Sequence, residues 1–213
     1  SDDPALARMG ISMAKGAGVE ITVKDLEHFL KSEDVETIIM GFTFAEETGV
    51  GDEAMEMLCE SLGDEPGCFV NAVEALGQIG DARAIEALSE LLGEGEYMGD
   101  RELASYALGQ IGEPAAESLI WHLGSLSPTD RTREFAARAL VDIGKPAVES
   151  LITALEEYDG VMWGAIAEVL GEIGDGQAVT RAVKSLIELL SDANQWVRED
   201  AKEALKKLGH EVE

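Results

Sequence analysis

The sequence predicts an all-α fold in which pairs of helices stack into one elongated array, an α-solenoid. Five short strings end in the same way, with small and apolar residues closed by a glycine, as in Ala107-Leu108-Gly109-Gln110-Ile111-Gly112. Their closing glycines lie 30 to 35 residues apart. A fixed period of this length indicates repeated units, each of which buries one face against its neighbours. The five glycines are Gly80, Gly112, Gly144, Gly174 and Gly209.

The unit around Gly144 shows the predicted helix pair. Residues 133–143 place small and apolar side chains at i, i+3, i+4 and i+7, which is one face of a helix. Gly144 follows as a stop signal, because glycine adopts left-handed backbone geometry at little cost. Lys145-Pro146 then opens a second helix, with proline in its first turn. Each unit is therefore a helix, a tight turn, a second helix and a loop.

The same pattern continues toward both ends of the chain. Gly49 and Gly18 precede Gly80 at intervals of 31 residues, although the apolar stretches before them are degenerate. The helix over 197–208 has no partner after it, and its lysines give it the polar face that a terminal cap needs. We predict about six helix pairs plus a closing helix. They form one domain over 1–213, with degenerate repeats in 1–65 and well-matched repeats in 66–209.

Composition restricts the partners and the compartment. The 213 residues include 43 acidic and 16 basic side chains, for a net charge of −27. Such a surface repels phosphate backbones and anionic lipids, so we expect no nucleic acid and no membrane as partner. The acidity either solvates the protein, as in a salt-adapted proteome, or steers a basic partner into a groove. We expect a cytoplasmic monomer with free thiols at Cys59 and Cys68, although a disulfide between them stays open.

Several strings resemble the HEAT family, in particular the short HEAT-like repeats first described in phycobilisome lyases. The resemblance rests on Ala136-Ala137-Arg138-Ala139-Leu140, on Gly80-Asp81, on Val197-Arg198 and on the run from Pro146 to Leu155. It covers about 66–209 well and the earlier residues weakly. It implies a right-handed superhelix, with the Ala-Leu-Gly helices on the concave face and the Leu-Ile helices on the convex face. The motif is specific for fold and almost silent on function.

The chain departs from that family pattern at one position. The motif arginine stands at Arg101, Arg133 and Arg198, but Phe69 and Trp163 replace it in two other repeats. In the family this arginine often pairs with an acid in the neighbouring turn, so a continuous ladder of such pairs is in doubt.

The three tryptophans fall at informative places in the repeats. Trp163 and Trp196 stand at helix starts, where we expect them to plug adjacent loops. Trp121 lies on an outer helix, where it either contacts a partner on the convex face or covers a repeat junction.

The residues give no support for an enzyme. The three histidines, His28, His122 and His210, fall in separate units, so no catalytic triad or metal site follows. Deoxyhypusine hydroxylase, a HEAT-family enzyme, needs repeated His-Glu pairs for its irons, and only His210-Glu211 matches here. We therefore predict no catalytic residue, no metal and no cofactor. A phycobilin lyase-like subunit or chaperone for cofactor attachment stays open as an alternative, because those proteins have no compact motif to match.

The leading hypothesis is a non-enzymatic scaffold that binds a protein or peptide in its concave groove. The inner positions implied by the family phase are apolar in the middle and acidic toward the C-terminal side, which suits a peptide or helix with basic residues. Tyr106 and Phe135 would anchor it, unless Leu103 and Phe135 tuck into the core between repeats. The candidate partner-binding residues are Glu74, Leu103, Tyr106, Gln110, Phe135, Arg138, Asp142, Glu168, Glu172, Glu199 and Glu203.

Overall fold

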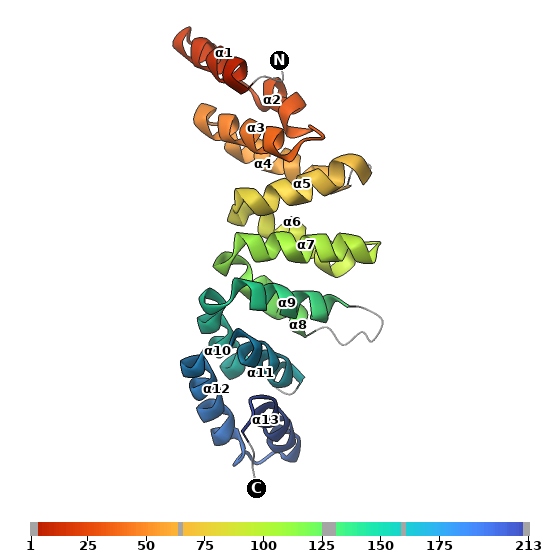
Figure 1. The fold of residues 1–213 in the computed structure, drawn as a ribbon, viewed down its shortest axis with the longest axis vertical. Helices are drawn as coiled ribbons and strands as arrows, with labels where there is room; N and C mark the ends of the chain where they lie inside the picture. Colours follow the sequence, from red (N-terminus) through yellow and green to blue (C-terminus); the bar gives the residue numbers. More distant parts are fainter. Residues whose placement is uncertain (1–3, 64–65, 125–130, 159–160, 211–213) are drawn as a thin grey trace.

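The fold is the predicted α-solenoid of six helix pairs and a closing helix. The computed structural model describes residues 4–63, 66–124, 131–158 and 161–210, which form helices and no strand. Figure 1 shows the helices stacked in one column from the N-terminal to the C-terminal end. The first helices of the pairs and the closing helix, called the A helices below, are α1 (Pro4–Gly16), α3 (Val35–Thr48), α5 (Pro66–Ile79), α7 (Met98–Ile111), α9 (Thr132–Ile143), α11 (Val161–Ile173) and α13 (Gln195–Lys207).

The second helices of the pairs, called the B helices below, form the other layer of the column. Short 3-10 turns lead into three of them, and Pro114 and Pro146 lie in two of these turns. The proline ring suits a first helical turn because no backbone N–H is needed there. The B helices are α2 (Val23–Leu30), α4 (Gly51–Glu60), α6 (Ile85–Glu94), α8 (Ala116–Leu123), α10 (Val148–Glu157) and α12 (Gly176–Leu189).

The predicted closing glycines are confirmed in every repeat, including the degenerate N-terminal ones. Each follows an A helix with a φ between 69° and 86°, and no other described glycine has a positive φ. A side chain at such a φ is strained, so glycine is needed to reverse the chain from the A helix toward the B helix. These glycines are Gly18, Gly49, Gly80, Gly112, Gly144, Gly174 and Gly209.

The core runs between the two layers along the whole column. Consecutive A helices contact one another, as α5 does α7 and α7 does α9, and so do consecutive B helices such as α6 and α8. The leucine four residues before the closing glycine is fully buried in each of the last five A helices, because this position faces the B layer. These leucines are Leu76, Leu108, Leu140, Leu170 and Leu205, all 0% exposed.

The motif arginine caps the helix that precedes its own. Arg101 Nε donates to Gly95 O at 2.9 Å, Arg133 Nε to Leu123 O at 2.7 Å and Arg198 Nη1 to Asp192 O at 2.7 Å. Each acceptor lies at or just beyond the end of a B helix, where carbonyl oxygens lack intrahelical donors. These three repeats therefore share a side chain that donates to a carbonyl oxygen at the end of the preceding helix.

Trp163 fills the same role without a charge. Its indole Nε1 donates to Leu155 O at 3.1 Å, and the side chain is buried against the end of α10. The expectation that Trp196 plugs a loop is wrong, since its side chain is 77% exposed. Trp196 stands two residues earlier in its repeat than Trp163, and at that phase the side chain points away from the preceding helix.

A single arginine joins the second and third repeats. The guanidinium of Arg83 contacts carboxylates of Glu46 on α3, Asp52 on α4 and Asp81 beside it. It also lies over the ring of Phe42, 5.6 Å from its centroid. The hydrogen bond from Arg83 lowers the pKa of Asp81, whose carboxylate also accepts the Arg83 backbone N–H. Three acids from three segments are therefore held together by one cation.

We expect Arg83→Gln to lower stability mainly at low salt. The variant leaves Glu46, Asp52 and Asp81 around a neutral side chain, at a cost of about 1 kcal/mol for such a network. Salt screens their repulsion over a Debye length of ~10 Å at 0.1 M, so the deficit should shrink at 1 M NaCl. The melting temperature of the parent chain should itself rise with salt, because its net charge is −27.

Thermal melts followed by circular dichroism at 0.02 and 1 M NaCl test this expectation. Arg138→Gln is the matched control, because Arg138 approaches one acid, Glu102, at 3.8 Å, and its side chain is 72% exposed. A deficit for Arg83→Gln that is the same at both salt concentrations would show that the cluster does not act through charge.

Candidate functional site

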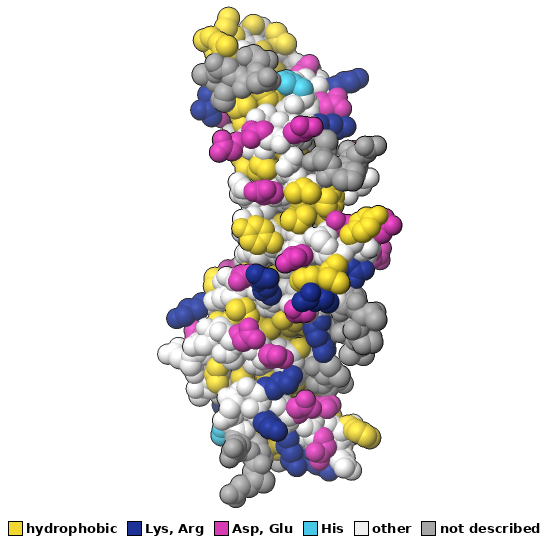
Figure 2. Space-filling model, turned by 45° about the vertical axis from the view of Figure 1, so that its right-hand side comes forward, with side chains coloured by type: hydrophobic (Ala, Val, Ile, Leu, Met, Phe, Trp, Pro, Cys, Tyr) yellow, Lys and Arg dark blue, Asp and Glu magenta, His cyan; other side chains and the backbone are white. Residues whose placement is uncertain are grey.

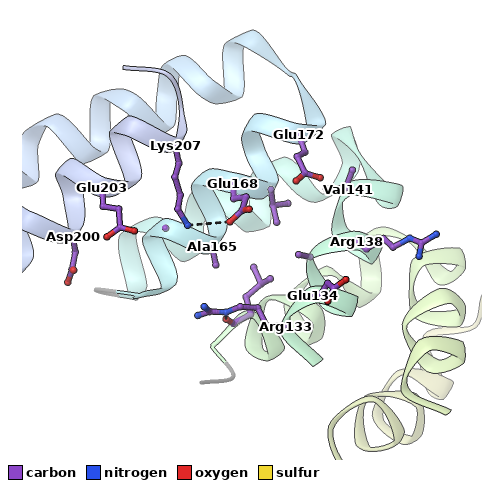
Figure 3. Close-up of a pocket in the computed structure, with 14 residues that line it drawn as sticks. Arg133, Glu134, Arg138, Val141, Ala165, Glu168, Glu172, Asp200, Glu203 and Lys207 are labelled. Atoms are coloured by element: carbon purple, nitrogen blue, oxygen red, sulfur yellow. Dashed lines mark hydrogen bonds and ion pairs between the residues drawn. The ribbon is translucent and has the colours of Figure 1, made fainter. Parts of the chain in front are cut away.

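A cavity of about 610 Å³ opens on the A-helix face between α9, α11 and α13. Its floor is apolar, with Ala137 and Val141 from α9 and Ala165 and Val169 from α11. Charged side chains of the three helices surround this floor, as Figure 3 shows. We call this cavity the A-face groove. The charged residues that line it are Arg133, Glu134, Arg138, Glu168, Glu172, Asp200, Glu203 and Lys207.

Three carboxylates of the A-face groove have no ion-pair partner within the described ranges. Lys207 Nζ lies 3.3 Å from Glu168 Oε2. Glu134 is paired with Arg131, whose hydrogen bond lowers the pKa of that carboxyl. The three other acids of the groove have no ion-pair partner among the described residues, so they remain available to a basic ligand. They are Glu172, Asp200 and Glu203.

Arg133 lines the groove and also holds the end of the preceding helix. Its Nε caps α8 through Leu123 O. Its Nη2 is buried and has no acceptor among the described residues, at a cost of about 1–3 kcal/mol for a donor left without a partner.

The A-face groove brings together four of the eleven predicted site residues: Arg138, Glu168, Glu172 and Glu203. The others lie elsewhere on the A helices. Glu74 and Gln110 are exposed on α5 and α7, Asp142 is exposed on α9, and Glu199 is exposed on α13, 3.9 Å from Lys202 Nζ. Tyr106 is 58% exposed, and its hydroxyl accepts a hydrogen bond from Gln110 Nε2 at 3.2 Å.

The prediction that Phe135 is an exposed anchor is wrong. Its side chain is 5% exposed and belongs to the core, with the guanidinium of Arg131 lying 5.5 Å from its ring centroid. Leu103 stands at the same repeat position, nine residues before the closing glycine, and is half-buried against the core. Ala165 is also buried there. In α9 this position points into the seam between neighbouring A helices, so Phe135 cannot present an anchor to a ligand.

The exposed ridge of the A helices lies at two other repeat positions. The residues six before the closing glycine, from Glu74 through Tyr106 and Arg138 to Glu168 and Glu203, are exposed in each of the last five A helices. The residues two before the glycine are exposed as well. These two positions are four apart and therefore form one stripe on each helix. They are Gln78, Gln110, Asp142, Glu172 and Lys207.

Two residues of the A-face groove were assigned other roles from the sequence. Arg133 was placed in the family ladder, and its place in the groove lining follows only from the packing around it. Lys207 was assigned to the polar face of the terminal helix, and its spacing from Gly209 also places it at the same inner position as Glu172.

Neither a group that could hold a metal ion nor a helix that could span a membrane is found in the described part of the chain. No group of three or more His, Cys, Asp or Glu side chains there could hold a metal ion. No helix within the described ranges is long and apolar enough to cross a membrane. The thiol of Cys59 is half-buried, and burial raises its pKa. The side chain of Cys68 lies outside the described residues.

Two family models of helical repeats match parts of this chain. A family model for HEAT repeats matches residues 116–206, and a model for the PBS lyase HEAT-like repeat matches residues 70–94. No curated protein sequence matches the chain.

Similar solved structures include engineered proteins and one natural enzyme. An engineered protein from a structural genomics consortium is 23% identical, covers 90% of this chain and 98% of its own, and has a TM-score of 0.37. A designed armadillo repeat protein is 18% identical, with coverage of 87% and 99% and a TM-score of 0.36. Human deoxyhypusine hydroxylase, solved with glycerol, is 19% identical, with coverage of 97% and 88% and a TM-score of 0.33.

Proposed function

We propose that this chain, which belongs to the HEAT-like repeat proteins, is a non-enzymatic scaffold that binds a basic peptide or helix in its A-face groove. A repeat array of this kind offers an extended surface for protein interaction in general. The observation that carries the finer proposal is the set of unneutralised acids, Glu172, Asp200 and Glu203, around an apolar floor.

The groove has the polar groups that a peptide requires. Lysine or arginine side chains of the partner would face the three acids. This attraction would mainly increase the association rate, and the increase would shrink as salt is added. The apolar floor would receive a small aliphatic side chain between these polar contacts.

An apolar anchor lies farther along the same face. Figure 2 shows hydrophobic side chains at mid-height of the molecule, over α5 and α7, with mixed charges toward the C-terminal end. Tyr106 on α7 and Val70 on α5 are exposed there, by 58% and 40%. With Phe135 in the core, Tyr106 is the aromatic anchor that remains for a long ligand. Burying its ring would contribute about 25 cal/mol per Å² before binding costs are subtracted.

Peptide display against the immobilised chain tests this proposal. We expect selected 16-residue peptides to be enriched in lysine and arginine. Glu172→Gln plus Glu203→Gln should slow their association several-fold at 0.05 M NaCl and little at 0.5 M. Tyr106→Ala should weaken the affinity for the longest binders at both salt concentrations. Surface plasmon resonance gives the association and dissociation rate constants, and hence the affinity.

The matched control removes two acids from the other layer. Glu156→Gln plus Glu188→Gln changes the net charge equally on α10 and α12, away from the groove, where both residues are exposed. Binding that responds equally to both double variants would reflect net charge alone and would contradict the groove. Tetrapyrrole absorbance carried by the purified chain would contradict the scaffold and favour cofactor attachment.

A further inference from the structure

A second cavity, of about 630 Å³, lies where the ends of B helices meet the starts of A helices, and it shares no lining residue with the A-face groove. It is bordered by the C-terminal parts of the B helices α6 and α8, by Tyr158 after α10, and by the first residues of α9 and α11. We call it the B-face pocket. The residues that carry the argument are Glu90, Glu94, Trp121, His122 and Tyr158.

Two exposed aromatic rings contribute to the B-face pocket. Trp121 on α8 is 69% exposed, and Tyr158, which follows α10, is 37% exposed. The other two tryptophans do not line the pocket: Trp163 is buried in the core and Trp196 lies at the start of α13. Trp121 lies in a pocket formed by successive repeats, and its exposed ring is available to a ligand.

The charge of the B-face pocket is negative. Glu90 and Glu94 stand four residues apart on α6, and neither has an ion-pair partner among the described residues. No lysine or arginine among the described residues lines the pocket. Arg101 and Arg133 cap α6 and α8 through backbone carbonyls, and Arg101 also donates to Thr132 Oγ1 at the edge of the pocket.

The end of α10 adds to this negative potential. A helix C-terminus carries a partial negative charge of about half an electron, which a cation close to it offsets. At α6 and α8 that cation is the capping arginine. At α10 the cap is the neutral indole of Trp163 on Leu155 O. Tyr158, the next residue after α10, lines the pocket, so the uncompensated helix end lies beside it.

Three other polar residues of the B-face pocket are held by hydrogen bonds. Ser118 donates to Ser89 Oγ at 2.7 Å, and the Ser89 hydroxyl lies 2.9 Å from His122 Nε2. Gly93 allows this arrangement, because a Cβ there would be 3.1 Å from His122 Cε1. Thr132 donates to Leu92 O and accepts from Arg101, so Glu90 and Glu94 are the charged acceptors among the described lining residues.

We infer that the B-face pocket binds an organic ammonium group, held by the faces of Trp121 and Tyr158 and by the negative charge of Glu90 and Glu94. An aromatic face attracts a cation, most strongly one with a low cost of desolvation, such as an N-methylated ammonium. Both choline-type molecules and N-methylated lysine side chains carry this group. The inference does not depend on the proposed function, since it uses none of its residues.

Titration followed by ¹H–¹⁵N spectra of the indole groups tests it. We expect choline and an acetylated tripeptide with central trimethyl-lysine to shift the Trp121 indole signal, with saturation on the order of 1 mM. The uncharged isostere of choline, 3,3-dimethylbutan-1-ol, should bind at least 5-fold more weakly. The Trp196 signal should stay in place as an internal control. Saturation by one cation and not the other tells which source the pocket accepts, and either supports the inference.

Variants separate the aromatic and the electrostatic contributions. Trp121→Leu should weaken binding roughly 5- to 30-fold, whereas Trp121→Phe, which keeps a ring, should lose less. Because these variants lack the Trp121 indole signal, their affinity is measured by isothermal titration calorimetry. Glu90→Gln plus Glu94→Gln should weaken binding several-fold at low salt. The control, Glu86→Gln plus Glu117→Gln, removes two exposed acids from α6 and α8 outside the pocket and should bind as the parent does.

Three results would overturn the inference. They are equal binding of the uncharged isostere, no shift of the Trp121 signal at 20 mM ligand, and unchanged affinity of Trp121→Leu. Because Trp121 is exposed, that variant should keep the far-ultraviolet circular dichroism of the parent, and the double glutamine variant gives a second test if it does not.

Discussion

Leu140→Ala should lower the free energy of unfolding by roughly 2–5 kcal/mol, and Leu205→Ala should lower it by less. The two leucines are both 0% exposed and hold the same repeat position, so the substitution removes the same atoms from equally buried sites. The two leucines differ in the number of A helices that pack against their own helix. Helix α9 contacts A helices on both sides, α7 and α11, whereas α13 contacts one A helix, α11, and the B helix α12.

The physical reason is the near-neighbour coupling of a repeat array. Each repeat contributes its own stability and that of the interfaces it makes, so a cavity in a central repeat loosens two interfaces. Urea denaturation followed by circular dichroism gives both free energies, provided the slope with urea stays that of the parent. Equal costs for the two variants would mean that local burial alone sets the loss and that the interfaces of α9 and α13 are equivalent.

Gly77→Ala should destabilise the protein, whereas Gly109→Ala should stabilise it. Both glycines stand three residues before a closing glycine, in α5 and α7. A Cβ at Gly77 would lie 2.9 Å from Ala107 Cα, which is closer than side-chain carbons approach backbone. A Cβ at Gly109 would lie 3.8 Å from Ala139, an ordinary van der Waals contact.

The expected magnitudes follow from two opposing effects. Replacing glycine by alanine inside a helix gains about 0.5–1 kcal/mol, because the unfolded chain loses freedom. At Gly77 this gain is outweighed by a clash that must push α5 and α7 apart, at about 1–3 kcal/mol. The fifth repeat already has Val141 at this position in α9, which shows that the array admits a side chain where the helices leave room. A stabilised Gly77→Ala in urea melts would show that α5 and α7 separate at little cost.

The candidate site was predictable only in part. Arg138, Glu168, Glu172 and Glu203 were found because one helical face follows from spacing alone, and all four are exposed. Phe135 was wrongly predicted to be exposed, because its position on the helix lies on the border between the exposed ridge and the seam between neighbouring A helices. A rotation of a few tens of degrees about the helix axis decides between them, and a period of 3.6 residues does not specify it.

The spacing of glycines and apolar residues was enough to predict the number and order of the helices and where each A helix ends. That information is local: glycine at a left-handed turn, proline in a first turn and an apolar stripe need no distant contact to be recognised. The tertiary structure alone decided that Arg133 keeps a buried donor without an acceptor, and that Trp163 replaces an arginine as the cap of the preceding helix. It also decided that Glu90 and Glu94 share a pocket with Trp121 and Tyr158. Those relations join different helices, and the distances between stacked helices depend on the side chains packed at each interface rather than on the residues within one helix.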